Sequence, residues 1–170
     1  MKYLLASAGL AVALTAQADA TYVLYYGVIG DWTVLCGRDE VTKATSCDLS
    51  APPPTLDVGM SRNVIVVREL APESFEISIA VRDVVDPEQP ASLWVDSAPP
   101  HEASIHQGSA RWQGGEAASI LTEMQAGSSL FYRVHLAPDG RPRDMEVPLS
   151  SFTRALTTYR DVARTHRVVE

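Results

Sequence analysis

The chain has 170 residues, of which 46% are hydrophobic, and a formal net charge of −7. This length suits one domain with a substantial core. The acidic balance argues against a nucleic-acid partner, which would favour a basic patch, and gives no reason to expect adhesion to anionic lipid.

The first twenty residues have the pattern of a secretory signal peptide. A positive start at Lys2 precedes an apolar run over residues 3–16, and residues 18–20 (Ala-Asp-Ala) form the small-x-small pattern that signal peptidase cuts. The run is too short to span a bilayer, and no later segment approaches the roughly 20 apolar residues of a membrane helix. We therefore expect a periplasmic or secreted protein whose single mature domain covers residues 21–170, with no integral membrane segment.

The two cysteines, Cys36 and Cys47, are eleven positions apart in a chain predicted to enter an oxidising compartment. A metal site would need more ligands, and no histidine lies between or beside them. The close Cys-x-x-Cys spacing of redox enzymes is also absent. We predict a disulfide that stabilises the fold by about 3 kcal/mol.

Strand patterns dominate the rest of the chain. Trp32, Val34 and Cys36 alternate on one face, and a short segment around Cys47 completes an antiparallel pair. The β-branched run at residues 64–67 predicts a strand buried on both faces. Further strands are predicted where apolar residues alternate or cluster, at 75–81, 93–95, 130–136 and 145–149.

Two segments have helical rather than strand periodicity. Apolar residues recur at helical spacing over 116–126, and a second amphipathic helix is predicted over 151–166, with basic residues crowding its far end. Strands follow one another without alternating helices, which argues against a parallel, doubly wound sheet. The predicted fold is mainly β: an antiparallel β-sandwich with these two helices at its periphery.

No motif in the sequence names a reaction. His101, Glu102 and His106 suggest a metal-dependent hydrolase only weakly, because the zinc-protease motif has its histidines four apart and here they are five apart. No serine lies in a Gly-x-Ser-x-Gly elbow. We expect no enzymatic activity and no cofactor, and keep the metal hydrolase as the weakest alternative.

Tryptophans mark the best candidate for an interaction surface. Trp32 shares a face with Cys36 and is predicted to fill the core. Trp94 and Trp112 flank an irregular region that contains His101 and His106. These four residues (Trp94, His101, His106 and Trp112) are therefore predicted to form a surface that contacts a partner, if their aromatic rings are exposed.

Two segments together resemble a known family, one that begins at residue 30 and one within residues 120–156. Residues 30–36 read Gly-Asp-Trp-Thr-Val-Leu-Cys before the second cysteine, and residues 120–134 and 147–156 supply a helix, a strand and a closing Leu-x-x-Phe-x-x-Ala-Leu helix. This order resembles the invasion-associated locus B family of exported bacterial proteins. Members often carry a second cysteine pair, which the corresponding residues 105–110 lack.

The resemblance implies an envelope or secreted β-sandwich without established catalytic residues, in a family named for host-cell invasion. We therefore expect a non-enzymatic periplasmic or secreted interaction protein. Its expected partner is another protein or a component of the envelope. The alternative is a periplasmic module that binds a small molecule or a glycan between Trp94 and Trp112.

Overall fold

The computed structural model describes residues 21–51, 64–80 and 85–166, so the predicted signal peptide lies outside the described residues. The strands are β1 (Thr21–Ile29), β2 (Trp32–Asp39), β3 (Thr45–Ala51), β4 (Val64–Ala71), β5 (Ser74–Ala80), β6 (Ala91–Val95), β7 (His101–Ala103), β8 (Ile105–His106), β9 (Ser109–Gln113), β10 (Ser129–Leu136) and β11 (Arg141–Pro148). The helices are α1 (Gly114–Ala126) and α2 (Phe152–His166).

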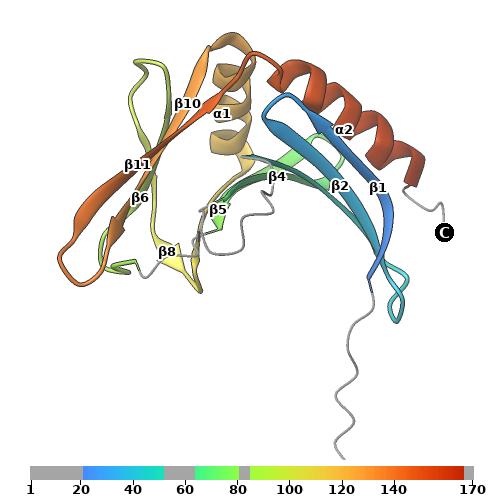
Figure 1. Ribbon diagram of the computed structural model, residues 1–170, viewed down its shortest axis with the longest axis horizontal. Coiled ribbons are helices and arrows are strands. Elements are labelled where there is room, and N and C mark those ends of the chain that lie inside the picture. The colour runs from blue at the N-terminus through green and yellow to red at the C-terminus, as the bar shows by residue number, and fades with distance from the viewer. Residues whose placement is uncertain (1–20, 52–63, 81–84, 167–170) are drawn as a thin grey trace, which may run out of the picture.

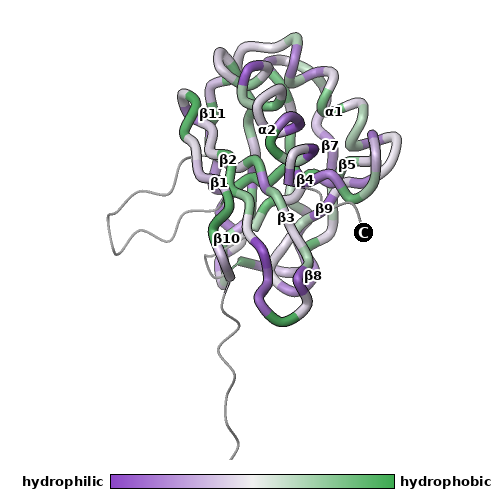
Figure 2. Tube along the Cα trace, turned by 90° about the vertical axis from the view of Figure 1, so that its right-hand side faces the viewer, coloured by the Kyte–Doolittle hydropathy of each residue, from purple (hydrophilic) through white to green (hydrophobic). Residues whose placement is uncertain are grey.

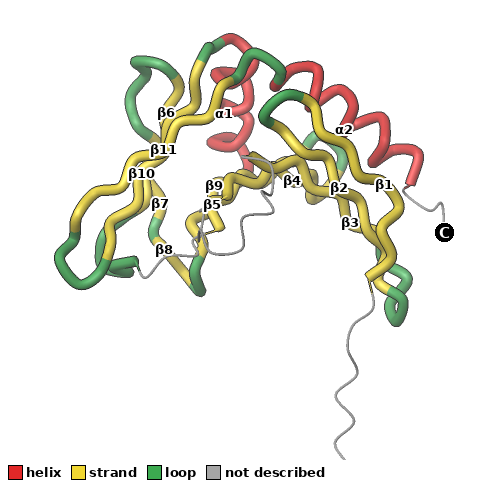
Figure 3. The backbone as a smooth tube through the Cα atoms, in the orientation of Figure 1, coloured by secondary structure: helices red, strands yellow, loops and turns green. Residues whose placement is uncertain are grey.

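The strands form two antiparallel sheets (Figure 3). The larger sheet has the order β1-β2-β3-β4-β5-β9-β8, and the smaller has the order β11-β10-β6-β7. Helix α1 lies between them and contacts β5 and β9 of one sheet and β6 of the other, while α2 lies across β1, β2 and β3 (Figure 1). The predicted class, a mainly β fold of two antiparallel sheets with two helices, is confirmed. Helix α1, which was expected at the periphery, instead lies between the two sheets because its buried face packs against both.

Both helices differ slightly from their predicted bounds. Helix α1 begins at Gly114, two residues before the predicted start, and Gly114 itself has a φ of +62°, which suits glycine. Helix α2 begins at Phe152, one residue after the predicted start. Helix α2 carries both hydrophilic and hydrophobic stretches (Figure 2), because its apolar residues face the sheet while the rest meet solvent.

Trp32 occupies the core at the junction of three elements, as the sequence predicted. Its side chain is fully buried, its indole Nε1 donates a hydrogen bond to the carbonyl of Pro148 at 3.2 Å, and its ring lies 4.8 Å from that of Phe152. These contacts join β2 to the end of β11 and to the start of α2. Burial of the indole therefore fixes the second helix against the larger sheet.

Residues 64–67 correct one prediction. Ile65 and Val67 are fully buried, but Val64 and Val66 are only half-buried, so β4 does not have two buried faces. Strand β4 lies inside an antiparallel sheet, and such a sheet commonly packs one face on the core and leaves the other more open.

The predicted disulfide joins Cys36 to Cys47 across the β2–β3 pair, where the two residues stand directly opposite each other. Both cysteines of the chain are thereby bonded. None of the helices in the described segments is long and apolar enough to cross a membrane.

Candidate functional site

The structure separates the four residues of the predicted interaction surface. Trp94 and His101 belong to β6 and β7 of the smaller sheet, whereas His106 and Trp112 belong to β8 and β9 of the larger sheet. Trp112 is 1% exposed and forms part of the core, so its ring is not available to a partner. His106 is exposed. Trp94 and Trp112 therefore do not frame one site.

His101 faces helix α1. Its Nδ1 lies 3.6 Å from the carboxylate of Glu116, and its Nε2 lies 3.2 Å from that of Glu123. The imidazole therefore ties the short strand β7 to α1 through two acidic side chains. The carboxylates beside this ring come from α1 and not from Glu102. Within the described segments, no group of three or more histidine, cysteine, aspartate or glutamate residues is placed to hold a metal ion.

Trp94 lies on the opposite face of the smaller sheet from His101, because His101 is paired with Leu93 and side chains alternate along a strand. Its ring stacks on that of Phe131 in the neighbouring strand β10, with centroids 5.7 Å apart and planes 15° apart. The Arg133 guanidinium lies 5.7 Å from the Trp94 ring centroid. The result is a small half-buried aromatic surface with a cation beside it.

Arg133 is held in place by Asp144 of β11. Its Nε and one terminal nitrogen donate to the two carboxylate oxygens at 2.6 and 2.7 Å. These hydrogen bonds lower the pKa of the Asp144 carboxyl and raise the pKa of the Arg133 guanidinium. The pair therefore stays charged at neutral pH and orients the cation that lies against Trp94.

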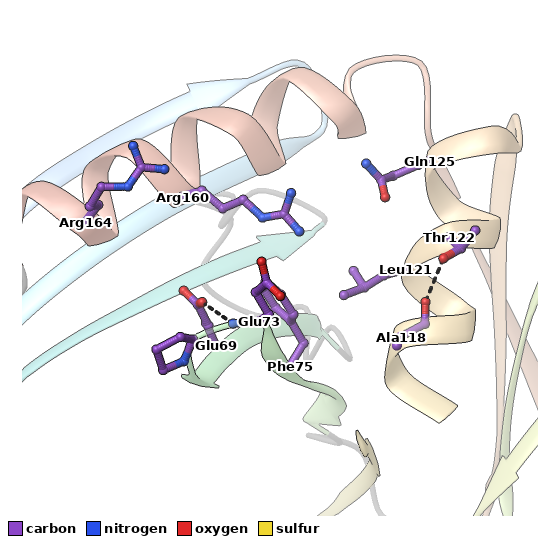
Figure 4. A pocket seen from close by; sticks show the side chains of 10 residues that line it. Glu69, Glu73, Phe75, Ala118, Leu121, Thr122, Gln125, Arg160 and Arg164 are labelled. Atoms are coloured by element: carbon purple, nitrogen blue, oxygen red, sulfur yellow. Dashed lines mark hydrogen bonds between the residues drawn. The ribbon is translucent and has the colours of Figure 1, made fainter. Parts of the chain in front are cut away.

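A larger concave site lies between the two helices, where the β4–β5 turn forms its floor (Figure 4). We call this cavity the interhelical groove; its volume is about 620 Å³. It is lined by Glu69, Pro72, Glu73, Phe75, Ala118, Leu121, Thr122, Gln125, Arg160 and Arg164. The lining thus comes from β4, β5, their turn and both helices.

Opposite charges lie on two sides of the interhelical groove. The Arg160 guanidinium stands 5.2 Å from the centroid of the Phe75 ring, and Arg164 follows one turn later along α2 (Figure 4). Glu69 and Glu73 provide the acidic side, where the Glu69 carboxylate accepts a hydrogen bond from the Glu73 backbone N–H at 2.9 Å. Glu73 has a φ of +60°, so this contact accompanies a backbone conformation that is uncommon outside glycine.

The α1 side of the interhelical groove is mixed in character. Leu121 and Gln125 project toward the opening between the helices (Figure 4). The Thr122 hydroxyl donates to the carbonyl of Ala118 at 2.9 Å, so this polar group is engaged within its own helix. The groove therefore combines an aromatic and aliphatic floor with cationic and anionic sides, an arrangement suited to recognition of an amphipathic ligand.

The sequence did not point to this groove. The arginines at 160 and 164 were interpreted as residues that compensate the helix dipole. Glu69 lies near the end of β4, and Glu73 lies in the turn that follows. A local pattern cannot show that this turn packs between two helices that are about 40 and 80 residues further along the chain. Only the folded structure shows that these two arginines, one helical turn apart, lie beside the largely buried ring of Phe75.

A solved structure shares this architecture. The crystal structure of invasion associated protein B from Bartonella henselae superimposes with a TM-score of 0.66 and 18% sequence identity, over 83% of this chain and 98% of that one. The chain has the fold of invasion associated protein B. No protein-family model matches the chain, and no curated protein sequence does.

The likeness to invasion associated protein B bears out the resemblance drawn from residues 30–36, 120–134 and 147–156, at the level of the fold. Those segments supply parts of β2, α1 and β10 and the β11–α2 junction. Of the residues that line the groove they contain Leu121, Thr122 and Gln125. Residues 105–110, where family members often carry a second cysteine pair, form the short β8–β9 hairpin.

Proposed function

We propose that this protein is a non-enzymatic interaction protein that works in the periplasm or outside the cell, and that a partner binds in the interhelical groove. The observation that carries the proposal is the Arg160 guanidinium held over Phe75 in an open cavity of about 620 Å³. The Cys36–Cys47 disulfide and the predicted signal peptide support an oxidising location. The fold shared with an invasion associated protein supports a role connected with invasion.

The lining of the interhelical groove favours binding over chemistry. Its described residues include no histidine, serine, cysteine or lysine, and the one hydroxyl among them, that of Thr122, donates to its own helix. The described lining therefore offers no free hydroxyl, thiol or amine as a nucleophile beside a base. The polar groups that are present, two arginines and two glutamates, are those that fix the orientation of a ligand.

The chemistry of the interhelical groove suggests a segment of another protein as ligand. Arginine and aromatic residues are enriched among the side chains that dominate binding energy at interfaces. An apolar side chain of the ligand would pack on Phe75 and Leu121, and an acidic group would meet Arg160. A basic group on the same segment would meet Glu73. We therefore propose an extended segment of an envelope or host protein, with both charges, as the ligand.

The test is quantitative capture from the native envelope. Protein produced from the full sequence with a C-terminal tag is compared with Arg160→Glu and with the control Arg154→Glu, an exposed arginine on α2 outside the groove. We expect one partner to be recovered by the wild type and the control and to fall about tenfold with Arg160→Glu, a loss typical of a binding hot spot. Equal recovery with all three proteins would place the binding site elsewhere.

The non-enzymatic part of the proposal needs its own test. The purified protein is assayed on a panel of esters, peptides and glycosides, together with variants of single polar residues. We expect no turnover above that of a heat-denatured sample. Turnover that one polar substitution abolishes would contradict the proposal, and stoichiometric zinc in such a sample would revive the hydrolase alternative at His101, Glu102 and His106.

A second candidate function rests on the Trp94–Phe131 pair. These stacked rings lie on the face of the smaller sheet, with the Arg133–Asp144 ion pair beside them. An aromatic surface bordered by oriented polar groups suits a small molecule or a sugar ring. A glycan array with the wild type and Trp94→Ala tests this function. Binding that is lost with Trp94→Ala supports it, and binding that persists or never occurs excludes it.

A further inference from the structure

The two sheets have four edge strands in the described part of the chain, and three of them are poor templates for pairing. Strand β8 has two residues and β7 has three. Strand β11 is longer, but it carries four charged residues and two prolines. Short length, charge and proline are the features by which natural sheets prevent association through their edges. The fourth edge, β1, is different.

Strand β1 is nine residues long and contains neither a charged residue nor a proline. Among the described strands it pairs with β2 alone, on one side. The register shifts between Val23 and Tyr25, so a bulge interrupts the first part of the strand, whereas Tyr25–Ile29 pairs regularly with β2. This regular stretch leaves its outer backbone groups available to another strand.

Large apolar side chains accompany this free edge. Tyr26 is 55% exposed and Val28 is 52% exposed, and they share one face of the strand. Leu35 of β2 stands directly opposite Tyr26 and is 40% exposed, which extends the apolar surface onto the second strand. An uncharged backbone edge and a contiguous apolar surface beside it are typical of an interaction site.

We propose that β1 binds a second copy of this chain, by antiparallel pairing of the two β1 strands about a two-fold axis perpendicular to the sheet. Gly27 is the centre of the regular stretch, so a two-fold axis there pairs Tyr26 with Val28 of the second copy. The same register pairs Tyr25 with Ile29. Every pair in this register is apolar, and no like charges meet.

The strand is suited to its own copy rather than to a foreign peptide. A foreign strand is selected by pockets or charges beside the edge, and the stretch Tyr25–Ile29 offers only uncharged side chains. The pocket with charged residues beside this strand lies at Tyr22 and Leu24, at the bulged end and outside the regular stretch. The two-fold axis keeps the same face of the larger sheet on the same side in both copies. The Tyr26–Leu35 surface of one copy therefore adjoins that of the other. Interfaces of this kind, in which one patch meets itself, are the commonest in soluble oligomers.

The contact area of one strand pair is small, so the dimer is a weak one, with a dissociation constant on the order of 10 µM. Sedimentation velocity of protein from the full sequence, over a concentration series that brackets this value, is the primary experiment. We expect twice the chain mass at high concentration. Tyr26→Lys should raise the dissociation constant at least about tenfold, since it places two lysines at the interface. A wild type that stays monomeric throughout the series overturns the proposal.

Leu70→Lys is the matched control, because Leu70 is 53% exposed, lies on β4 and receives the same new charge. Leu70→Lys should dimerise like the wild type, and an equal loss of dimer in Leu70→Lys and Tyr26→Lys overturns the proposal.

Circular dichroism checks that each variant is folded. If Tyr26→Lys unfolds, Val28→Lys replaces it. Hydrogen exchange then identifies the contact: β1 amides should become protected as concentration rises, and a dimer without this protection excludes strand pairing. The β1 edge lies outside the interhelical groove, so failure here leaves the proposed function untouched.

Discussion

Tyr159 of α2 donates its hydroxyl to the carbonyl of the disulfide-bonded Cys47 at 3.3 Å. The same phenol oxygen accepts the backbone N–H of Glu69 at 2.8 Å. One buried hydroxyl thus connects α2 to both β3 and β4, directly beside the disulfide and at the base of the β4 segment that lines the interhelical groove.

Replacement of Tyr159 by Phe should destabilise the protein by about 1–3 kcal/mol. The change keeps the ring but leaves the Glu69 N–H without this acceptor and the Cys47 carbonyl without this donor. Urea unfolding followed by circular dichroism measures the loss. Tyr22→Phe is the control, because Tyr22 is exposed on β1 and should change stability by no more than about 0.5 kcal/mol. Equal stability of the two variants would show that the Tyr159 hydroxyl contributes nothing.

Removal of the Cys36–Cys47 disulfide should lower the free energy of unfolding by about 3 kcal/mol. The bridge joins strands that already pair, so it acts mainly by restricting the unfolded chain and not by creating the β2–β3 pair. The double variant Cys36→Ala/Cys47→Ala, compared with the wild type in urea, measures the effect. Mass spectrometry of native material with both thiols free would contradict the bridge itself.

The local part of the fold was predictable from sequence. The alternation at Phe75, Ile77 and Ile79 identified β5, and helical spacing of Ile120 and Met124 identified the buried face of α1. Both patterns arise because each element buries one face. Apolar residues therefore recur along the sequence with the period of the strand or helix. The disulfide followed from two cysteines in a predicted oxidising compartment.

Features that depend on neighbouring elements were not predictable. Strand β1 lacks alternation and was not identified, because an edge strand with apolar side chains on both faces has no period to detect. Val64 and Val66 were expected to be buried, but burial depends on what covers the second face of the sheet. Trp112 was predicted to belong to an interaction surface if its ring were exposed. Its ring is buried because β9 packs against α1, and this contact between distant elements cannot be predicted from local sequence.

The ion pair between Arg133 and Asp144 should make stability depend on pH at the acidic end. Folding lowers the pKa of Asp144 below 3.8, so its contribution is present above pH 3.8 and is lost as pH falls through the lower, folded value. Both side chains are largely exposed, so the contribution at neutral pH is about 0.5 kcal/mol. Asp144→Asn should therefore be less stable than the wild type at pH 7, and the difference should shrink below pH 3.8.

Thermal unfolding of the wild type and Asp144→Asn between pH 2 and pH 7 measures this dependence. The range extends to both sides of pH 3.8, below which the Asp144 contribution should be lost. High salt should reduce the difference at pH 7, because exposed charges are screened. Asp161→Asn is a suitable control: Asp161 pairs with Arg164 at 3.6 Å on an exposed helical surface, without a pair of short hydrogen bonds. A difference that persists unchanged at pH 2 would assign the effect to packing rather than to charge.

Cleavage of the leader before Thr21 should yield a mature protein that retains its fold. Thr21 pairs with Asp39 at the start of β1, so a cut at this bond keeps every β1–β2 pair that the structure describes. Intact-mass analysis of native material should give the mass of residues 21–170 less two hydrogens for the disulfide. An uncleaved chain recovered from the cytosol would contradict export. A cut several residues further on would shorten β1 from its bulged end and leave Tyr25–Ile29 paired with β2.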